Sequence, residues 1–256
     1  MKPCINYLWI LIFSFSCKQS PTPHPSDLEA ANIKGNVAKL ENIIHSANAS
    51  ACCPAAESND CKQVIYFYND KGNLAEYSTL NIDGEIIQTS KYEYNRSNRC
   101  SGINRFEGSK LVEKQLNTLS NGKLVRVKVF NRDGKLEKIL KYDYSGAEVT
   151  GGVTLNASGE VVSSFVNSYV NGRLDARTDN DADGNIIKIT RFTRNSNDDV
   201  IETFSSFPTT KTEQKFSYEY EYDARGNWIK KTQRQGVDIA GIIMRNITYT
   251  NPQAGL

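Results

Sequence analysis

The chain has 256 residues, of which 39% are hydrophobic and 23% charged, a balance typical of folded proteins and unlike that of disordered chains. Its 31 Lys and Arg against 29 Asp and Glu leave a formal net charge of +2, which gives no electrostatic support for a nucleic acid as the main ligand. Thirteen Tyr and ten Phe are residues that favour β-strands.

The N-terminus has the pattern of an export signal. Met1-Lys2 precedes an apolar run that is too short to remain in a membrane, so residues 1–16 are predicted to be a signal peptide. The stretch Ser14-Phe15-Ser16-Cys17 resembles a bacterial lipobox, although Ser14 stands where that pattern usually has Leu. The resemblance implies lipidation of Cys17. The alternative is ordinary cleavage and a soluble exported protein.

Residues 17–31 are predicted to be a lipidated tether, because their first part is polar and Pro-rich. The Lys after Cys17 favours the outer membrane, with the domain facing either the periplasm or the outside. Within the tether, residues 26–29 have the pattern of a short capped helix. Residues 32–251 are predicted to form a single β-domain, which begins with a strand over 32–44, and residues 252–256 a tail.

The mature chain holds four cysteines besides Cys17, in and after a Cys-containing insertion at residues 46–61. They are Cys52, Cys53, Cys61 and Cys100. An even number in an exported protein predicts two disulfides, and neighbouring cysteines rarely bond to each other. We therefore expect Cys52 and Cys53 to pair with Cys61 and Cys100, in either combination. A zinc site is less favoured because the spacing lacks paired CxxC motifs.

Turn residues recur along most of the domain. The turn glycines from Gly108 to Gly184 lie 14, 12, 12, 13, 13 and 12 residues apart, with alternating apolar and polar runs between them. Asn95–Asn98 and Asn195–Asp198 fit two positions where a turn lacks Gly. This rhythm predicts an all-β fold, a long antiparallel meander of about 12–14 strands curled into an open or half-closed barrel-like sheet. A membrane-spanning barrel is disfavoured by the mean hydropathy of −0.51.

Several units resemble YD-repeat (RHS-like) sequences: YDARGNW, YNDKGNL and FNRDGKL. With the opening Ile33–Val37 and the closing Arg245–Tyr249, the chain is similar to uncharacterised exported lipoproteins of Bacteroidetes. The resemblance implies β architecture and carries over no catalytic residues.

Two stretches are candidate ligand sites. Asp179, Asp181 and Asp183 precede Gly184 as in the first half of a calcium loop, but the position of the bidentate Glu holds Thr190. An ordinary acidic turn is therefore the favoured interpretation, with a bound calcium ion as the alternative. Tyr218, Tyr220 and Tyr222, with Trp228 after the turn, suit a glycan- or peptide-binding platform, or an aromatic face turned into the core.

No catalytic motif is present, and the two histidines offer no triad. The chain is therefore predicted not to be an enzyme. We expect a cell-envelope lipoprotein, held to the membrane by its lipid anchor, that binds or scaffolds a protein or a glycan, with no nucleic acid partner. The alternatives are a carrier or chaperone with a curled-sheet cavity for a lipid, and an envelope-polymer hydrolase with paired carboxylates.

Overall fold

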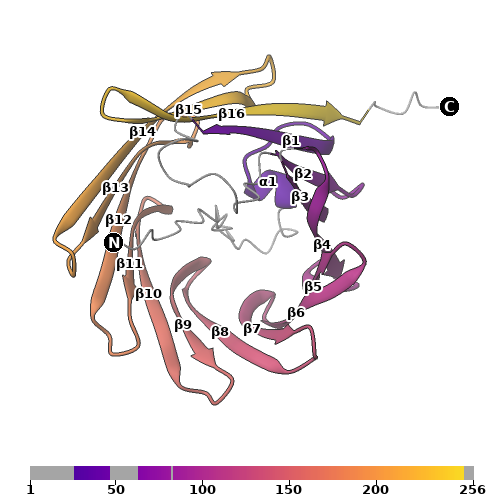
Figure 1. Cartoon of the computed structure of the whole chain (residues 1–256), viewed down its shortest axis with the longest axis vertical. Coiled ribbons are helices and arrows are strands. Elements are labelled where there is room, and N and C mark those ends of the chain that lie inside the picture. The colour runs from indigo at the N-terminus through magenta and orange to yellow at the C-terminus, as the bar shows by residue number, and fades with distance from the viewer. Residues whose placement is uncertain (1–25, 47–62, 82, 251–256) are drawn as a thin grey trace.

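The computed structural model describes residues 26–46, 63–81 and 83–250, which form one short helix and sixteen strands (Figure 1). The elements are α1 Asp27–Ala30, β1 Val37–Ser46, β2 Gln63–Tyr68, β3 Leu74–Leu80, β4 Ile86–Tyr94, β5 Cys100–Glu107, β6 Lys110–Ser120, β7 Lys123–Asn131, β8 Leu136–Ser145, β9 Glu148–Asn156, β10 Val161–Val170, β11 Arg173–Asn180, β12 Ile186–Arg194, β13 Val200–Phe207, β14 Thr212–Tyr222, β15 Trp228–Gln235 and β16 Asp238–Tyr249. None of the described helices is long and apolar enough to cross a membrane.

The strands form a closed antiparallel barrel in sequence order (Figure 1). β1 pairs with β16 over nearly its whole length, from Val37 opposite Tyr249 to Ser46 opposite Gly241. The all-β meander is confirmed, whereas the expected open or half-closed sheet of 12–14 strands is wrong. The count was low because the turn at Pro208–Lys211 has no Gly and the turn at Gly236 lies outside the rhythm. Closure satisfies the two edges that an open sheet would expose.

Eight turns share one geometry, built on an Asn or Asp at the first position. Asn131 illustrates it: its N–H donates to Lys135 O, while its Oδ1 accepts the N–H groups of Asp133 and Lys135, each at 3.0 Å. The fourth position takes a positive φ, supplied by Gly134 here and by Asn98 and Asp198 in the two turns predicted to lack Gly. The other seven turns begin at Asn69, Asn81, Asn95, Asn156, Asp181, Asn195 and Asp223.

Tyrosines near strand ends tie neighbouring strands together. Tyr144 Oη donates to Leu124 O at 2.8 Å, and Leu124 lies near the start of the preceding strand β7, 20 residues earlier in the sequence. Three other tyrosines donate to the carbonyl 20 residues before them: Tyr94, Tyr169 and Tyr220. The hydroxyls of these tyrosines are therefore structural, because each satisfies a carbonyl near the barrel end.

The contacts of α1 identify which face of the wall points into the barrel. α1 lies inside the ring of strands (Figure 1), and Leu28 packs with Leu40, Tyr66 and Ile247. Paired residues on neighbouring strands share a face, and successive residues alternate between faces. Leu40 pairs with both Tyr66 and Ile247, so this set faces the lumen, and the pairings extend the assignment around the barrel.

The outer face is charged over much of its circumference. Glu221 pairs with Lys230 and Arg126 with Lys141, all on the face opposite the lumenal residues. Side chains of Lys215, Glu219 and Glu221 are more than half exposed, at 61%, 62% and 63%. These positions carry formal charge where a lipid-facing strand would present apolar side chains.

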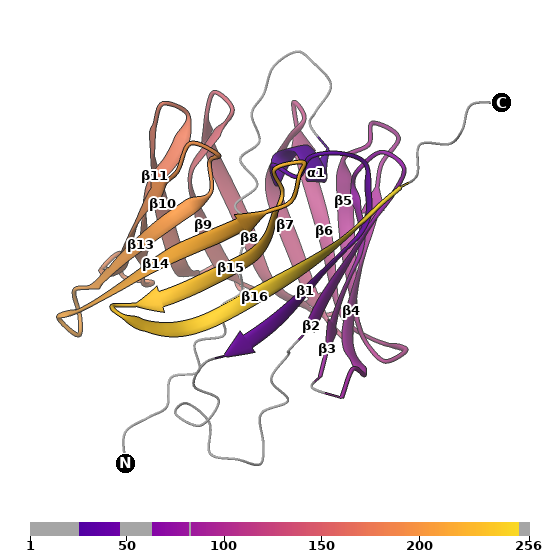
Figure 2. The same ribbon diagram turned by 90° about the horizontal axis from the view of Figure 1, so that it is seen from above.

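Residues 26–36 cross one end of the barrel, and α1 lies at that end in Figure 2. Ser26 caps α1 in a capping box with Glu29, and the N–H of Leu28 donates to Gly72 O at 3.0 Å. Further along, Asn32 Nδ2 donates to Asn197 O at 2.8 Å. Asn227 then accepts from Lys34 N at 2.7 Å and donates to Lys34 O at 2.9 Å. Part of the expected tether is thus built into the barrel.

Candidate functional site

The strands β14, β15 and β16 place aromatic and cationic side chains on the same stretch of lumenal wall. Arg245 lies opposite Asn42, two residues from lumenal Leu40, and Ile243, opposite Ile44, lies on the same face. Lys231 pairs with Ile243 and with Tyr220. The aromatic–cation cluster, as we name it, consists of Tyr218, Tyr220, Trp228, Lys231 and Arg245.

The cations of the cluster lie over its aromatic rings. Cζ of Arg245 is 3.2 Å from the ring centre of Trp228, and Nε of Arg245 donates to Asn42 Oδ1 at 3.0 Å. Nζ of Lys231 is 4.1 Å from the ring centre of Tyr218 and 5.7 Å from that of Tyr220. Because the ring centres of Tyr220 and Trp228 are 6.1 Å apart, the five side chains form one connected group.

Burial perturbs both cations. It lowers the pKa of Lys231 to about 8, and the positive charge of Arg245 adds to this effect. Burial lowers the pKa of Arg245 to about 10, against the opposing influence of Tyr66 and Tyr68. Burial also raises the pKa of Tyr68 to about 12 and that of Tyr220 above its usual value, so these phenols stay neutral at physiological pH.

Within residues 26–46, 63–81 and 83–250, neither Lys231 nor Arg245 forms an ion pair. Asp199 favours the charged form of both from a distance, while its Oδ2 accepts a hydrogen bond from Tyr222 Oη at 2.8 Å. A buried arginine and a half-buried lysine side by side, without a carboxylate in contact, are costly to fold. Such an arrangement is typical of a site that receives an anionic or polar ligand.

The structure separates the predicted aromatic residues into two kinds. Tyr218, Tyr220 and Trp228 belong to the cluster, half-buried on the lumenal face, as the inward-facing interpretation predicted. Tyr222 lies at the end of the barrel, where its Oη accepts from Asn195 Nδ2 at 3.0 Å and donates to Asp199. Tyr222 is therefore part of the turn structure, although its ring centre is 6.1 Å from that of Tyr220.

Sequence reasoning missed Lys231 and Arg245. One signal for Arg245 is present: it interrupts the apolar row Ile243, Ile247 and Tyr249, which alternation places on its own face. A single cation in such a row indicates either a buried partner or a site. Lys231 carries no comparable signal, because its strand reads Ile-Lys-Lys-Thr-Gln and either Lys could face outward.

The acidic residues of the calcium candidate do not converge. Asp179 faces the lumen and its Oδ1 accepts from Arg177 Nε at 2.7 Å. Asp181 caps its turn as Asn131 does, accepting N–H groups from Asp183 at 3.0 Å and Asn185 at 2.8 Å. A hydrogen bond from Asn185 Nδ2 at 3.1 Å lowers the pKa of Asp181 most, and the backbone N–H groups add to this effect. Among the described residues no three His, Cys, Asp or Glu side chains are placed to hold a metal ion. The geometry is that of the ordinary acidic turn.

The cysteine predictions remain open. Cys17, Cys52, Cys53 and Cys61 lie outside the described residues, so lipidation and the pairing of the disulfides stay predictions. Cys100 has a free thiol in the described structure; it donates to Gly102 O at 3.5 Å, and burial raises its pKa to about 11. Cys100 starts β5 at the α1 end of the barrel, opposite the end where Ser46 and Gln63 flank the insertion.

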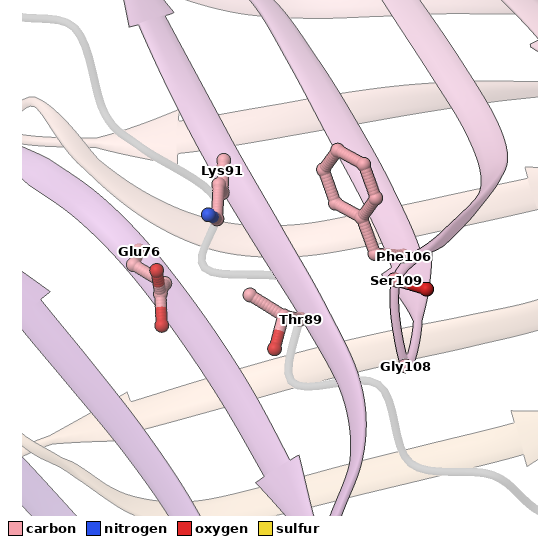
Figure 3. A pocket seen from close by; sticks show the side chains of 6 residues that line it. All are labelled: Glu76, Thr89, Lys91, Phe106, Gly108 and Ser109. Atoms are coloured by element: carbon pink, nitrogen blue, oxygen red, sulfur yellow. The ribbon is translucent and has the colours of Figure 1, made fainter.

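A hollow lies on the outer face over β3, β4 and β5 (Figure 3). It has a volume of about 290 Å³ and is lined by Glu76, Thr89, Lys91, Phe106, Gly108 and Ser109. Nζ of Lys91 lies 5.9 Å from the ring centre of Phe106, and Glu76 pairs with Lys91 across the strands. Its volume is at the lower limit for ligand pockets and its cation has an acidic neighbour, so it is a weaker candidate than the aromatic–cation cluster.

Comparison with known proteins identifies the fold. No family model matches the sequence, and no curated protein matches it. A porin-like protein of Bacteroides uniformis is similar in structure over 83% of this chain and 98% of its own, with a TM-score of 0.56 and 13% identity. A porin-like protein of Bacteroides vulgatus matches 86% of this chain and 100% of its own at a TM-score of 0.42 and 12% identity.

The Tc holotoxin pore of Photorhabdus luminescens matches 80% of this chain and 11% of its own at a TM-score of 0.30 and 14% identity. At such identities the first of these likenesses concerns the fold alone. The YD-repeat resemblance of the sequence remains a prediction.

Proposed function

We propose that this chain is a non-catalytic binding protein of the cell envelope that holds a glycan against the lumenal wall of β14–β16. The observation that carries the proposal is the aromatic–cation cluster, in which Tyr218, Tyr220 and Trp228 are half-buried and present ring faces beside two cations. Sugar rings stack on such faces, and neighbouring polar groups orient the hydroxyls.

The polarity of this wall favours a glycan over a lipid. Next to the cluster lie Gln233, which pairs with Tyr218, and Asn42, which binds Arg245. Tyr218 Oη and Thr203 Oγ1 share a hydrogen bond of 3.1 Å. A carrier of acyl chains needs a continuous apolar lining, because buried amide and hydroxyl groups without polar partners cost free energy. For the same reason, a protein partner is less favoured than a glycan on this face.

The envelope location is supported by the export-like N-terminus and by the similarity of fold to a porin-like protein of Bacteroides uniformis. The charged outer face favours a barrel that stands in water, tethered through Cys17, over one embedded in lipid. For the absence of catalysis, the support is the state of the lumenal carboxylates: Glu113 and Asp179 lie on separate strands, and each binds an arginine. Paired carboxylates for glycoside hydrolysis must face one another instead.

Tryptophan fluorescence offers a direct test. Trp9 lies in the predicted signal peptide, so a chain that begins at Cys17 has Trp228 as its one tryptophan. We expect members of a panel of envelope oligosaccharides to change Trp228 emission and to bind with a measurable Kd. The variant Tyr218→Ala should weaken binding about tenfold, since aromatic contacts contribute about 0.5–1.5 kcal/mol. Phe204→Ala, on the outer face of β13, is the matched control.

Two results would contradict the proposal. One is a panel in which no glycan binds, by fluorescence or by calorimetry. The other is uptake of a fluorescent fatty acid by the delipidated protein with displacement at Trp228, which would favour the carrier instead. If Tyr218→Ala and Phe204→Ala weaken binding equally, the binding site lies outside the aromatic–cation cluster.

A further inference from the structure

The lumenal arginines of β5 and β11, Arg105 and Arg177, each have an acid beside them. Nε of Arg177 lies 2.7 Å from Asp179 Oδ1, and the charge of Asp179 also favours protonation of Lys188. On the other flank, Nη1 of Arg105 lies 3.3 Å from Glu113 Oε2. Pairing of this kind is the usual way to keep a charge at a half-buried site.

Lys231 departs from this rule although its surroundings resemble those of Arg177. Each cation lies over a lumenal aromatic ring, Arg177 over Phe165 at 4.0 Å and Lys231 over Tyr218 at 4.1 Å. Arg177 finds its acid two residues along the same strand, at Asp179. The position two residues along from Lys231 is Gln233, which is neutral and faces the same lumen.

We propose that the glycan carries an acidic group, a carboxylate, sulfate or phosphate ester, which is bound by Nζ of Lys231 and the guanidinium of Arg245. This inference rests on the proposed function and names the chemical class of its ligand. The bound anion takes the place that Asp179 occupies beside Arg177. It neutralises two cations that otherwise repel each other, and the rings of Tyr218 and Trp228 hold the sugar to which it is attached.

Arg245 suits this role because Asn42 fixes its orientation. Nε donates to Asn42 Oδ1 at 3.0 Å and Cζ lies 3.2 Å from the ring centre of Trp228, while the residue as a whole is 7% exposed. The terminal nitrogens then present donors in a fixed geometry, which matches the planar oxygens of a carboxylate or the face of a sulfate. Lys231 supplies a second, more adaptable charge.

The test compares oligosaccharides that differ only in charge. Oligogalacturonate and its methyl ester form one pair, and a sulfated and an unsulfated laminari-oligosaccharide form another. Calorimetry with the mature full-length protein should show at least one acidic member binding about tenfold or more tightly than its neutral partner. The variants Lys231→Met and Gln233→Glu should both remove this preference, the second by supplying an internal carboxylate while every aromatic ring stays in place.

Lys230→Met is the matched control, because Lys230 is the adjacent residue on the outer face and binds Glu221 at 2.7 Å. This variant should keep the preference for the acidic member. Binding of the acid should also weaken as the pH rises from about 7 to about 9 in the wild type, since Lys231 then loses its proton, and it should stay constant in Lys231→Arg. Thermal melts of each variant confirm that the barrel is folded.

The outcomes separate the inference from the function on which it rests. Equal binding of acidic and neutral members overturns the anionic group and leaves the glycan-binding function intact. A preference for the acid that survives both Lys231→Met and Gln233→Glu overturns the assignment to these residues. Failure of every member of both pairs, with no change in Trp228 emission, counts against the proposed function together with the inference.

Discussion

Two arcs of the lumenal wall use the same ingredients with different outcomes. On β9–β11, which we call the paired arc, the cation Arg177 lies over Phe165 and binds Asp179. The ring centres of Phe165 and Tyr142 are 6.4 Å apart. On β14–β16 the cations Lys231 and Arg245 lie over Tyr218 and Trp228, and no carboxylate of the described residues forms an ion pair with either. The first arc is complete in itself and stabilises the barrel. The second lacks such an acid among the described residues, and the proposed binding site rests on this contrast.

The largest expected change in stability is at Gly152 on β9, in the paired arc. A Cβ added there would lie 2.5 Å from Lys141 O and 2.8 Å from a ring carbon of Phe165. Because the nearer atom belongs to the backbone of β8, Gly152→Ala should lower the free energy of unfolding by about 3 kcal/mol. Chemical denaturation measures the change.

Gly241→Ala on β16 is the control for Gly152→Ala, since its Cβ would lie 3.4 Å from His45 O, an ordinary contact. We expect it to change the free energy of unfolding by less than about 1 kcal/mol. Equal losses in the two variants would show that the packing of Phe165 over Gly152 is unimportant.

Removing Asp179 from the paired arc should leave its cation without an acid, as on β14–β16. Asp179→Ala leaves Arg177 and Lys188 without their carboxylate, so the free energy of unfolding should fall by about 1–2 kcal/mol, a value reduced from that of a fully buried pair because the Asp179 and Arg177 side chains are 26% and 30% exposed. Asp183→Ala, an exposed residue of the adjacent turn, should have little effect. A neutral result at Asp179 would remove the contrast between the arcs.

Removing a cation from the unpaired arc should act in the opposite direction. Lys231→Met keeps the length of the side chain and its contacts with the aromatic rings, but it deletes a charge that burial disfavours. We expect the free energy of unfolding at neutral pH to rise by about 1–2 kcal/mol, while the preference for the acidic glycan is lost. A loss of stability in Lys231→Met would mean that the lysine is a structural residue.

The smallest expected effect is the pH dependence of the stability gained in Lys231→Met. Lys231 has a folded pKa of about 8 against an ordinary value of 10.5, so below about pH 8 its charge is present in both states and disfavours the folded one. As the pH rises towards 10.5 the unfolded chain also loses the proton, and the stability difference between Lys231→Met and wild type should shrink to zero. A difference that stays constant across this range would place the origin of the gain elsewhere.

The sequence predicts much of the architecture. The Asx turn residues and their partners at the fourth position, including Asn98 and Asp198 without Gly, are local hydrogen-bonded units whose geometry depends on a few neighbouring residues. Alternation on β14 likewise places Tyr218 and Tyr220 on one face. The order of strands follows, because short turns leave an antiparallel neighbour as the only partner within reach.

Closure and the site were decided by contacts between distant segments. β1 and β16 meet across some 200 residues, and no local pattern in either strand names the other. The same closure brings Asn42 to Arg245 and determines which of Lys230 and Lys231 faces the lumen. Local hydrogen bonding sets turns and strands, whereas burial and the lack of an acid partner are properties of the whole wall. For this reason the sequence alone predicted the aromatic row, and only the tertiary structure revealed the two cations beside it.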